Sequence, residues 1–309
     1  MFQLARPLFI TCETPLHAGS GDSLGIVDLP IQRERHTSFP KIEASSLKGA
    51  LREAFEQDKK KVSPSDIIKA FGPDTNASEH AGALGFTDAR LLLFPVKSMK
   101  GVFAWITCPK ALRQLQTDLA LAKDSPKLEL TNIAPKDGEC IALAEGLCDV
   151  VNKGKVILEE YCFTRIDDDA KKPIAKFENA MLLHFWLAKN AFGSTDDYWK
   201  EKAKNSIIVL SDNDFRDFVN HSTEVTTRVK ISSKTGTVEK GALFTEEFLP
   251  AESVMYSLVL ASPEFNKEKR GEKAEDMMKI FTDGLPEVMQ IGGNATLGKG
   301  IVRTKLIQY

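Results

Sequence analysis

The sequence lacks the features that usually identify a disulfide-stabilised, zinc-finger or membrane protein. Its five cysteines form no CxxC pair and no metal-finger spacing, which favours reduced, buried thiols in the cytoplasm. No apolar run approaches the ~18 residues of a membrane span. The apolar N-terminal stretch is closely bracketed by Arg6 and Glu13, so it is too short for a signal peptide. We therefore expect no membrane partner.

The chain also lacks an excess of charge of either sign. It carries 41 basic and 43 acidic residues, a net charge of −2, so bulk charge does not indicate a nucleic-acid binder. Any basic surface must be local, with acidic surface elsewhere. The 309 residues, 42% hydrophobic and 27% charged, are those of a globular protein with a large core, in one large domain or two ordinary ones.

The apolar patterns are clearest at the two ends of the chain. The expected strands are 8–16, 84–94, 102–108, 254–261 and 301–307. The expected helices are 45–57, capped by Ser45 or Ser46, then 63–72, 109–123, 177–191, 214–220 and 273–290, the last with a possible break at Pro286. Without its middle, this order resembles a ferredoxin-like (RRM-like) βαββαβ core, so we predict an α+β fold with large insertions.

The expected organisation has three parts: a core from 1–124 and 250–309, a mostly helical insertion at 125–223, and a β-hairpin at 224–249. The segment HSTEVTTRVKISSKTGTVEKGALFTEEFLP alternates β-branched and polar residues around KTG, which is typical of a hairpin. It has too few large apolar residues for a core hairpin, so we expect an arm that projects from the body.

The most informative segment is the loop and helix start at 17–52, which combines glycines with many charged residues. An ordered loop of this kind is a candidate polyanion site. Asp28 lies in GIVDLPIQRE between apolar residues, where a docked loop would hold its carboxylate in place. It could hold Mg²⁺ that also contacts phosphate oxygens, or steer a 2′-hydroxyl toward in-line attack. The alternative is a turn aspartate that caps its own backbone.

Two further residues are candidate acids or bases. His17 is a candidate by residue type, although a histidine packed at a strand end is the alternative. Glu246, with its neighbour Glu247, lies at the base of the predicted hairpin arm.

Four cations are candidates for a groove that binds a phosphate backbone. Lys48 and Arg52 are four residues apart on one helix face, and Arg33 and Arg35 lie in the preceding loop. The alternative is an ordinary solvated face.

The segment GGNATLGKG at 292–300 is a second candidate for binding phosphate. The residues concerned are Gly292, Gly293, Gly298, Lys299 and Gly300. With little Cβ shielding, consecutive N–H groups can approach a phosphate, and the lysine adds a charge. The segment has neither the ending of a Walker loop nor the strand–helix context of a dinucleotide fingerprint. The alternative is a tight turn with a glycine C-cap.

Taken together, these segments resemble the RAMP superfamily of CRISPR systems. The blocks GIVDLPIQRERHTSFPKI, SSLKGALR and GGNATLGKG carry the resemblance. The order of PLHAGSGDSLGIVD, SSLKGALR and TRVKISSKTGTVEKGALFTEEFLP is similar to that in the repeated backbone subunits of type III-B (Cmr) RNA-guided effector complexes.

The resemblance implies a function. Copies of such a subunit assemble along a guide RNA with other Cmr subunits, and each pushes a hairpin thumb across the duplex of the guide with a single-stranded target RNA. A loop aspartate, here Asp28, then drives target cleavage that depends on Mg²⁺ or Mn²⁺. His17 and Glu246 match further positions of the family, and Phe248 stands where relatives can carry a tyrosine. Arg228 and Lys230 suit a wedge over a duplex.

Two alternatives within the superfamily remain open. One is a guide-RNA scaffold without nuclease activity, which would lose nothing when Asp28 is removed. The other is a metal-independent endoribonuclease that processes guide RNA with His17, which metal dependence would exclude. An unrelated small-molecule enzyme would need paired acids and bases around a compact pocket, and the sequence contains no such constellation.

Overall fold

We analysed a computed structural model of the chain, which describes residues 2–22, 25–58, 61–73, 81–122, 125–131, 133–143, 150–166, 175–192, 197–265 and 271–308. The strands are β1 Leu4–Cys12, β2 Lys41–Ile42, β3 Leu84–Phe86, β4 Ala89–Lys97, β5 Phe103–Thr107, β6 Leu128–Leu130, β7 Glu139–Leu143, β8 Val151–Asn152, β9 Lys155–Leu158, β10 Tyr161–Arg165, β11 Ala175–Phe177, β12 Ile207–Leu210, β13 Glu224–Ile231, β14 Val238–Phe248, β15 Val254–Ala261, β16 Val288–Gln290 and β17 Ile301–Leu306. The helices are α1 Ala44–Gln57, α2 Pro64–Phe71, α3 Pro109–Leu121, α4 Leu183–Asn190, α5 Asp197–Asn205, α6 Asp212–His221, α7 Ala274–Gly284 and the 3₁₀ turn η1 Ala295–Leu297.

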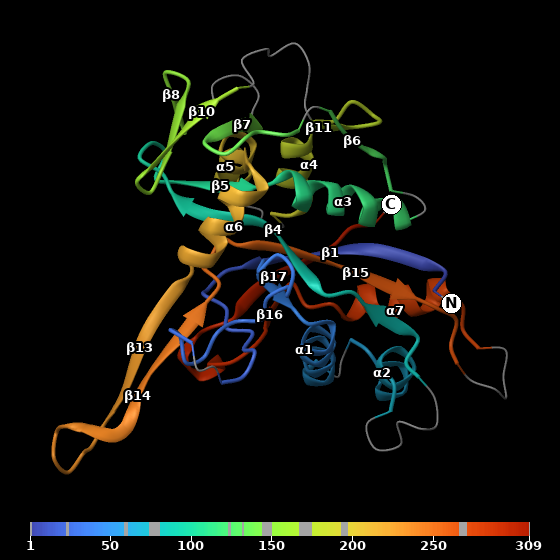
Figure 1. The fold of residues 1–309 in the computed structure, drawn as a ribbon. Coiled ribbons are helices and arrows are strands. Elements are labelled where there is room, and N and C mark those ends of the chain that lie inside the picture. The colour runs from blue at the N-terminus through green and yellow to red at the C-terminus, as the bar shows by residue number, and fades with distance from the viewer. Residues whose placement is uncertain are drawn as a thin grey trace.

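One continuous sheet forms the centre of the molecule (Figure 1). Its strands lie in the order β16-β17-β1-β15-β4-β5-β12-β7-β10-β9-β8, with β2 beside β4 and β3 beside β15. Strand β1 pairs antiparallel with β17 and β15, and β15 pairs antiparallel with β4. With α1 after β1 and α7 after β15, the order β17-β1-β15-β4 is that of a βαββαβ unit. The predicted ferredoxin-like core is therefore confirmed.

Helices α1 and α7 cover one face of this core (Figure 1). Phe55 of α1 stacks on Phe281 of α7 with 5.6 Å between ring centroids. Gly284 permits this close approach, because a Cβ at that position would overlap the Phe55 ring. The helix ends there instead of running to residue 290 as predicted, and Val288–Gln290 forms the edge strand β16.

The prediction that a serine caps the N-terminus of α1 is wrong. Neither Ser45 nor Ser46 caps the helix; the N-cap is Glu43, which makes no side-chain cap bond. Asp88, between β3 and β4, instead accepts a 2.9 Å hydrogen bond from the Ala44 N–H. A residue distant in sequence therefore satisfies a helix end that local pattern alone assigned to serine.

The prediction of a mostly helical segment at 125–223 is wrong. It contains the helices α4 to α6, but also seven strands, from β6 to β12. Strand β12 adds parallel to β5, and β7, β10, β9 and β8 continue the sheet beyond it. Short strands of three to five residues leave little periodicity to read, which explains the error.

On the other face of the sheet, α3 and α4 bury a second apolar cluster that includes Phe9, Trp105 and Trp186 (Figure 1).

Three further sequence-based expectations concern the first strand, membrane spans and the cysteines. The first strand, β1, covers Leu4–Cys12 instead of the predicted residues 8–16. Among the described residues, no helix is both long and apolar enough to cross a bilayer. Cys12, Cys108 and Cys140 are buried, whereas Cys162 is exposed; Cys148 lies outside the described residues.

The hairpin arm predicted at 224–249 consists of β13 and β14, which pair antiparallel as a separate two-stranded sheet. Figure 1 shows it projecting from the body below α6. Its described side chains are mostly exposed from Glu224 to Phe244. The exposed apolar residues are Val225, Val229, Ile231, Val238, Leu243 and Phe244.

Candidate functional site

The root of the hairpin arm is where the predicted site residues meet. Leu29 forms an isolated parallel bridge with Glu246, through a 3.0 Å hydrogen bond from the Leu29 N–H to the Thr245 carbonyl and another from the Glu247 N–H to the Leu29 carbonyl. Successive side chains of a strand point to opposite faces. Thr245 and Glu247 therefore face the loop that carries Asp28, whereas Glu246 and Phe248 face His17 and the glycine-rich loop.

Thr245 holds the carboxylate of Asp28. Its Oδ2 accepts hydrogen bonds from the Thr245 N–H at 2.7 Å and from the Thr245 hydroxyl at 2.8 Å. The side chain is otherwise exposed. The prediction that the loop fixes this carboxylate is therefore consistent with the geometry, and the alternative of an aspartate that caps only its own turn is not.

The two hydrogen bonds also set the charge of Asp28. The Thr245 N–H, followed by the Thr245 hydroxyl, stabilises the carboxylate and lowers the pKa of Asp28 below its usual value of 3.8. Such a group is ionised at neutral pH and is a weak base. It is better suited to hold a cation or to orient a polar group than to remove a proton from a hydroxyl.

A single divalent cation fits Asp28 only as a weakly held ion. In the part of the chain that the structure describes, no cluster of three or more histidine, cysteine, aspartate or glutamate residues could hold a metal. One exposed, ionised carboxylate matches the way Mg²⁺ binds, with most of its ligands from water and substrate phosphates.

His17 and Glu246 lie together on the opposite side of β14. His17 is buried, and its Nδ1–H donates a 2.7 Å hydrogen bond to the Glu247 carbonyl, so in the neutral ring Nε2 is the unprotonated nitrogen. Nε2 lies 3.7 Å from Glu246 Oε1. The carboxylate of Glu246 also pairs with Arg228 Nε at 2.6 Å and accepts a 2.5 Å hydrogen bond from Asn294. These contacts join the arm to the glycine-rich loop.

Arg33 is bound within the protein and does not form part of an open cationic groove. Its guanidinium pairs with Glu247 at 2.5 Å and donates to the carbonyl oxygens of Ser38 and Val219. The side chain is 20% exposed and that of Glu247 only 7%, so the pair is largely desolvated. This pairing does not favour the prediction that Arg33 binds RNA, because a phosphate would have to displace a buried carboxylate.

The other cations predicted to bind RNA differ in their ion pairs and in their exposure to solvent. Arg52 pairs with Glu56 at 2.7 Å and donates to the Gly72 carbonyl. Lys48 is half-buried beside it, and burial, with the Arg52 charge, lowers the pKa of the Lys48 ammonium. Arg35 is exposed. Lys230 pairs with Glu239 on the exposed arm at 2.7 Å.

The glycine-rich loop uses most of its predicted N–H donors on its own chain. The N–H groups of Gly293, Gly298, Lys299 and Gly300 donate to carbonyl oxygens of His17, Ala295, Asn294 and Pro15, respectively. The predicted phosphate grip by these four N–H groups is therefore not preformed. Gly292 and Gly300 are required for close approach to the protein's own backbone, because a Cβ at either position would overlap a carbonyl oxygen.

Phe248 is fully buried and carries cations over its ring. Lys299 Nζ lies 4.8 Å and Arg228 Cζ 5.7 Å from the ring centroid, and the His17 ring lies 5.6 Å away. A buried aromatic ring with cations over its face stabilises their placement. Phe248 thus supports the site through packing and needs no hydroxyl for that purpose.

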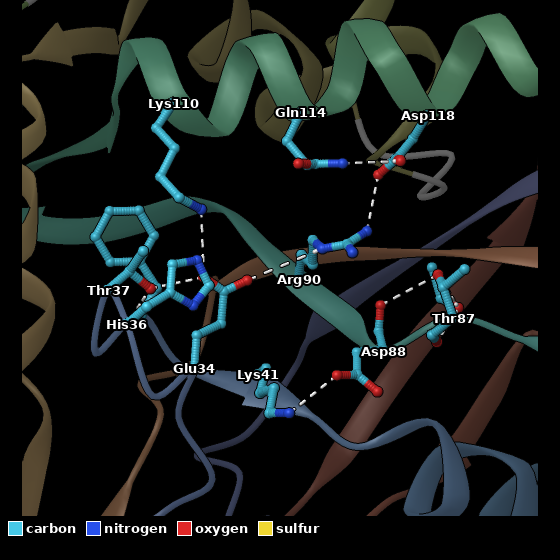
Figure 2. A network of polar contacts seen from close by, with 12 residues as sticks. Glu34, His36, Thr37, Lys41, Thr87, Asp88, Arg90, Lys110, Gln114 and Asp118 are labelled. Carbon is cyan, nitrogen blue, oxygen red and sulfur yellow. Dashed lines mark hydrogen bonds and ion pairs between the residues drawn. The ribbon is translucent and has the colours of Figure 1, made fainter.

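A polar network anchors the far end of the Asp28 loop to the body (Figure 2). Glu34 accepts hydrogen bonds from Thr37 at 2.6 Å and from Lys110 of α3 at 3.2 Å, and Arg90 of β4 lies 3.9 Å from it. Arg90 also pairs with the buried Asp118 at 2.9 Å. Burial opposes ionisation of Glu34, but Thr37 and Lys110 outweigh it and lower the pKa of Glu34.

Sequence reasoning missed Thr245 and Asn294, and named Glu247 only as a neighbour of Glu246. The signal that could have found Thr245 is the alternation in FTEEF, which assigns Thr245 and Glu247 to one face of a strand. The pairing of that face with Asp28 is a contact across 217 residues of chain, and no local pattern contains it.

The model of the RAMP superfamily matches residues 9–303. The CRISPR system Cmr endoribonuclease Cmr4 of Pyrococcus furiosus is 41% identical over 294 residues, which cover 95% of this chain and 92% of that protein.

Two solved structures share the fold. The crystal structure of oligomeric Cmr4 from Pyrococcus furiosus has a TM-score of 0.72 at 31% identity and covers 99% of each chain. The cryo-EM structure of the type III-B Cmr-beta bound to cognate target RNA also has a TM-score of 0.72, at 25% identity, and covers 99% of this chain and 98% of that one.

Matched substitutions can distinguish a glycine of the loop that is required for close packing, Gly292, from one that is required only for its backbone conformation, Gly298. Gly292→Ala should lower the free energy of unfolding by roughly 3 kcal/mol, because it combines backbone strain at φ +83° with overlap on His17. Gly298→Ala, at φ +70° with open space around it, should cost only about 1 kcal/mol. Urea unfolding of both variants measures the difference, and equal costs would contradict the assignment of Gly292 to packing.

Proposed function

The chain belongs to the RAMP superfamily, and we propose that it is a guide-RNA-binding backbone subunit of a type III-B Cmr effector complex that cleaves complementary target RNA. The observation that carries the proposal is 41% identity, over nearly the whole length, to a Cmr endoribonuclease. The proposed partners are the guide RNA, a single-stranded target RNA, other copies of the chain and the other Cmr subunits.

Asp28 is the proposed cleavage residue. It is an exposed carboxylate, ionised through its hydrogen bonds to Thr245, at the point where the arm leaves the body. It would hold Mg²⁺ or Mn²⁺, which would supply positive charge to the phosphate at the scissile position. The low basicity of Asp28 favours this role over that of a general base.

The arm is the proposed thumb that displaces a base pair of the guide–target duplex. Val229, Leu243 and Phe244 are among its exposed apolar side chains. Apolar side chains inserted between bases can unstack a duplex at a cost of a few kcal/mol. Because Thr245 at the root of the arm is hydrogen-bonded to Asp28, a nucleotide displaced at that root would be presented to the carboxylate.

The metal-independent alternative is not favoured by the geometry of His17. Its ring is buried, and Nδ1 is already bonded to the Glu247 carbonyl while Nε2 faces Glu246. Its proposed contribution is to hold the arm against the glycine-rich loop.

The decisive test is Asp28→Asn in a complex reconstituted with a synthetic guide and a labelled target RNA. The substitution keeps the shape and removes the charge, so the cleavage rate should fall on the order of 10²-fold or more, while assembly and target binding stay unchanged. EDTA should likewise abolish cleavage by the wild-type complex, and added Mg²⁺ or Mn²⁺ should restore it.

The matched control is Asp22→Asn, which changes a second exposed aspartate of the same loop and should cleave at the wild-type rate. If Asp28→Asn cut as fast as wild type, the chain would be a scaffold subunit. Cleavage in excess EDTA would indicate acid–base chemistry at His17.

Lys48 is the stronger candidate of the helix pair for guide-RNA phosphates. Lys48→Ala should weaken guide-RNA binding for all sequences and reduce the slope of log K against log salt by roughly 0.7. Arg52→Ala should change the slope less, because its guanidinium is already paired with Glu56. Fluorescence anisotropy across a salt series measures both slopes, and a base-specific loss would contradict a backbone contact.

Shortening the arm should separate folding from cleavage. Replacement of residues 229–242 by a short Gly-Ser turn keeps the ion pair of Arg228 with Glu246 and leaves the root in place. The melting temperature should stay close to wild type, whereas regularly spaced cleavage should be lost. Target products on a sequencing gel report the outcome, and an unchanged ladder would show that the arm is not the wedge.

A further inference from the structure

One hydroxyl group bridges two parts of Asp28. The Thr245 Oγ1 accepts a 3.0 Å hydrogen bond from the Asp28 N–H and donates a 2.8 Å hydrogen bond to Asp28 Oδ2. The Thr245 N–H donates a second bond to the same oxygen at 2.7 Å, and its carbonyl accepts from the Leu29 N–H. Thr245 thus fixes the backbone and the carboxylate of Asp28 together.

The two carboxylate oxygens are consequently not equivalent. Oδ2 accepts both hydrogen bonds from Thr245, and among the described residues no hydrogen bond reaches Oδ1. Because rotation of the carboxylate would break both bonds, the free oxygen has a fixed direction. A ligand carboxylate whose orientation is set by a neighbouring residue binds a metal more tightly than one that rotates freely.

We propose that Thr245 is the positioning residue of the cleavage site, which holds Asp28 with one oxygen bonded and the other directed toward the divalent cation and the target RNA. This inference rests on the proposed function of Asp28. Thr245 acts only through Asp28 and takes no part in proton transfer.

The position of Thr245 in the fold extends its role. It lies on β14, in register with Thr227 of β13, so it belongs to the hairpin arm. The arm and the carboxylate are therefore oriented by the same residue. A displacement of the arm root carries Asp28 with it, which keeps the cleavage position at a constant offset from the wedge.

The chemistry of the side chain defines the variants. Thr245→Val has nearly the same shape and keeps the β-branch, but it has no hydroxyl to accept from the Asp28 N–H or to donate to Oδ2. Thr245→Ser keeps the hydroxyl. Thr227→Val makes the same change on the paired residue, which has no contact with Asp28 among the described side chains. Thr245→Ala removes the same hydroxyl if the valine variant does not fold.

The first measurement needs neither metal nor RNA. Carboxyl ¹³C resonances of labelled aspartate, followed against pH in the isolated chain, report the pKa of Asp28, with Asp28→Asn to assign the signal. The pKa should rise part of the way toward its ordinary value in Thr245→Val, which loses the hydroxyl but keeps the backbone N–H that contributes most. It should stay at the wild-type value in Thr245→Ser and Thr227→Val. An unchanged pKa in Thr245→Val would overturn the inference.

The second measurement is target cleavage by reconstituted complexes against Mg²⁺ concentration. Thr245→Val should need roughly 10–100-fold more Mg²⁺ for half-maximal cleavage, with unchanged affinity for target RNA, and Thr245→Ser should restore the wild-type profile. A wild-type profile in Thr245→Val, beside an inactive Asp28→Asn, would overturn the role of Thr245 alone. Full activity of Asp28→Asn would instead overturn the proposed function, whatever the pKa of Asp28.

Discussion

The site depends on the ion pair and hydrogen bonds of one buried carboxylate, that of Glu247. It pairs with Arg33 at 2.5 Å and accepts hydrogen bonds from the Thr223 hydroxyl at 2.8 Å and the Ile31 N–H at 3.0 Å, while its own carbonyl accepts from His17. Three separate segments of chain, at residues 17, 31–33 and 223, therefore meet at one residue of β14. A desolvated charge of this kind requires all its partners, because removal of one leaves the charge uncompensated at a cost of about 3–5 kcal/mol. The direction of the arm and the course of the Asp28 loop follow from that requirement.

The internal pairing of cations determines how a nearly neutral chain can bind a polyanion. Arg33 and Arg228 are neutralised by buried carboxylates, whereas Arg52 and Lys230 are paired with partly exposed ones. An RNA phosphate can compete with an exposed carboxylate at little cost, but not with a buried one. The cations that are paired with exposed carboxylates thus lie on α1 and along the arm, whereas the buried pairs lie within the body.

The sequence predicted the parts of the fold that have strong local periodicity. The βαββαβ core, the arm and α2 follow from apolar spacing and turn residues. The mixed strands of the middle segment did not, because their short lengths leave too few residues for a period. The cap of α1 by Asp88 also escaped prediction, because the two partners lie 44 residues apart.

The candidate site was predictable in its residues but not in their partners. Asp28, His17 and Glu246 were identified by residue type and by resemblance, and the structure places all three at the root of the arm. Their separation onto two faces of β14 required the register of the strand. The ion pair of Arg33 with Glu247 was not predictable, because a buried arginine and a solvated one have the same appearance in a sequence.

The continuity of β14 from the exposed arm into the body has a mechanical consequence. The strand runs without interruption from Val238 to Phe248, and Leu249 then bridges to Leu16 inside the core. The exposed part of the arm is a two-stranded ladder with a register irregularity between Val229 and Ile231, where bending is easiest. Close-packed interiors have low compressibility and transmit strain. The core therefore fixes the direction in which the arm leaves the body, while its far end can bend independently of that root.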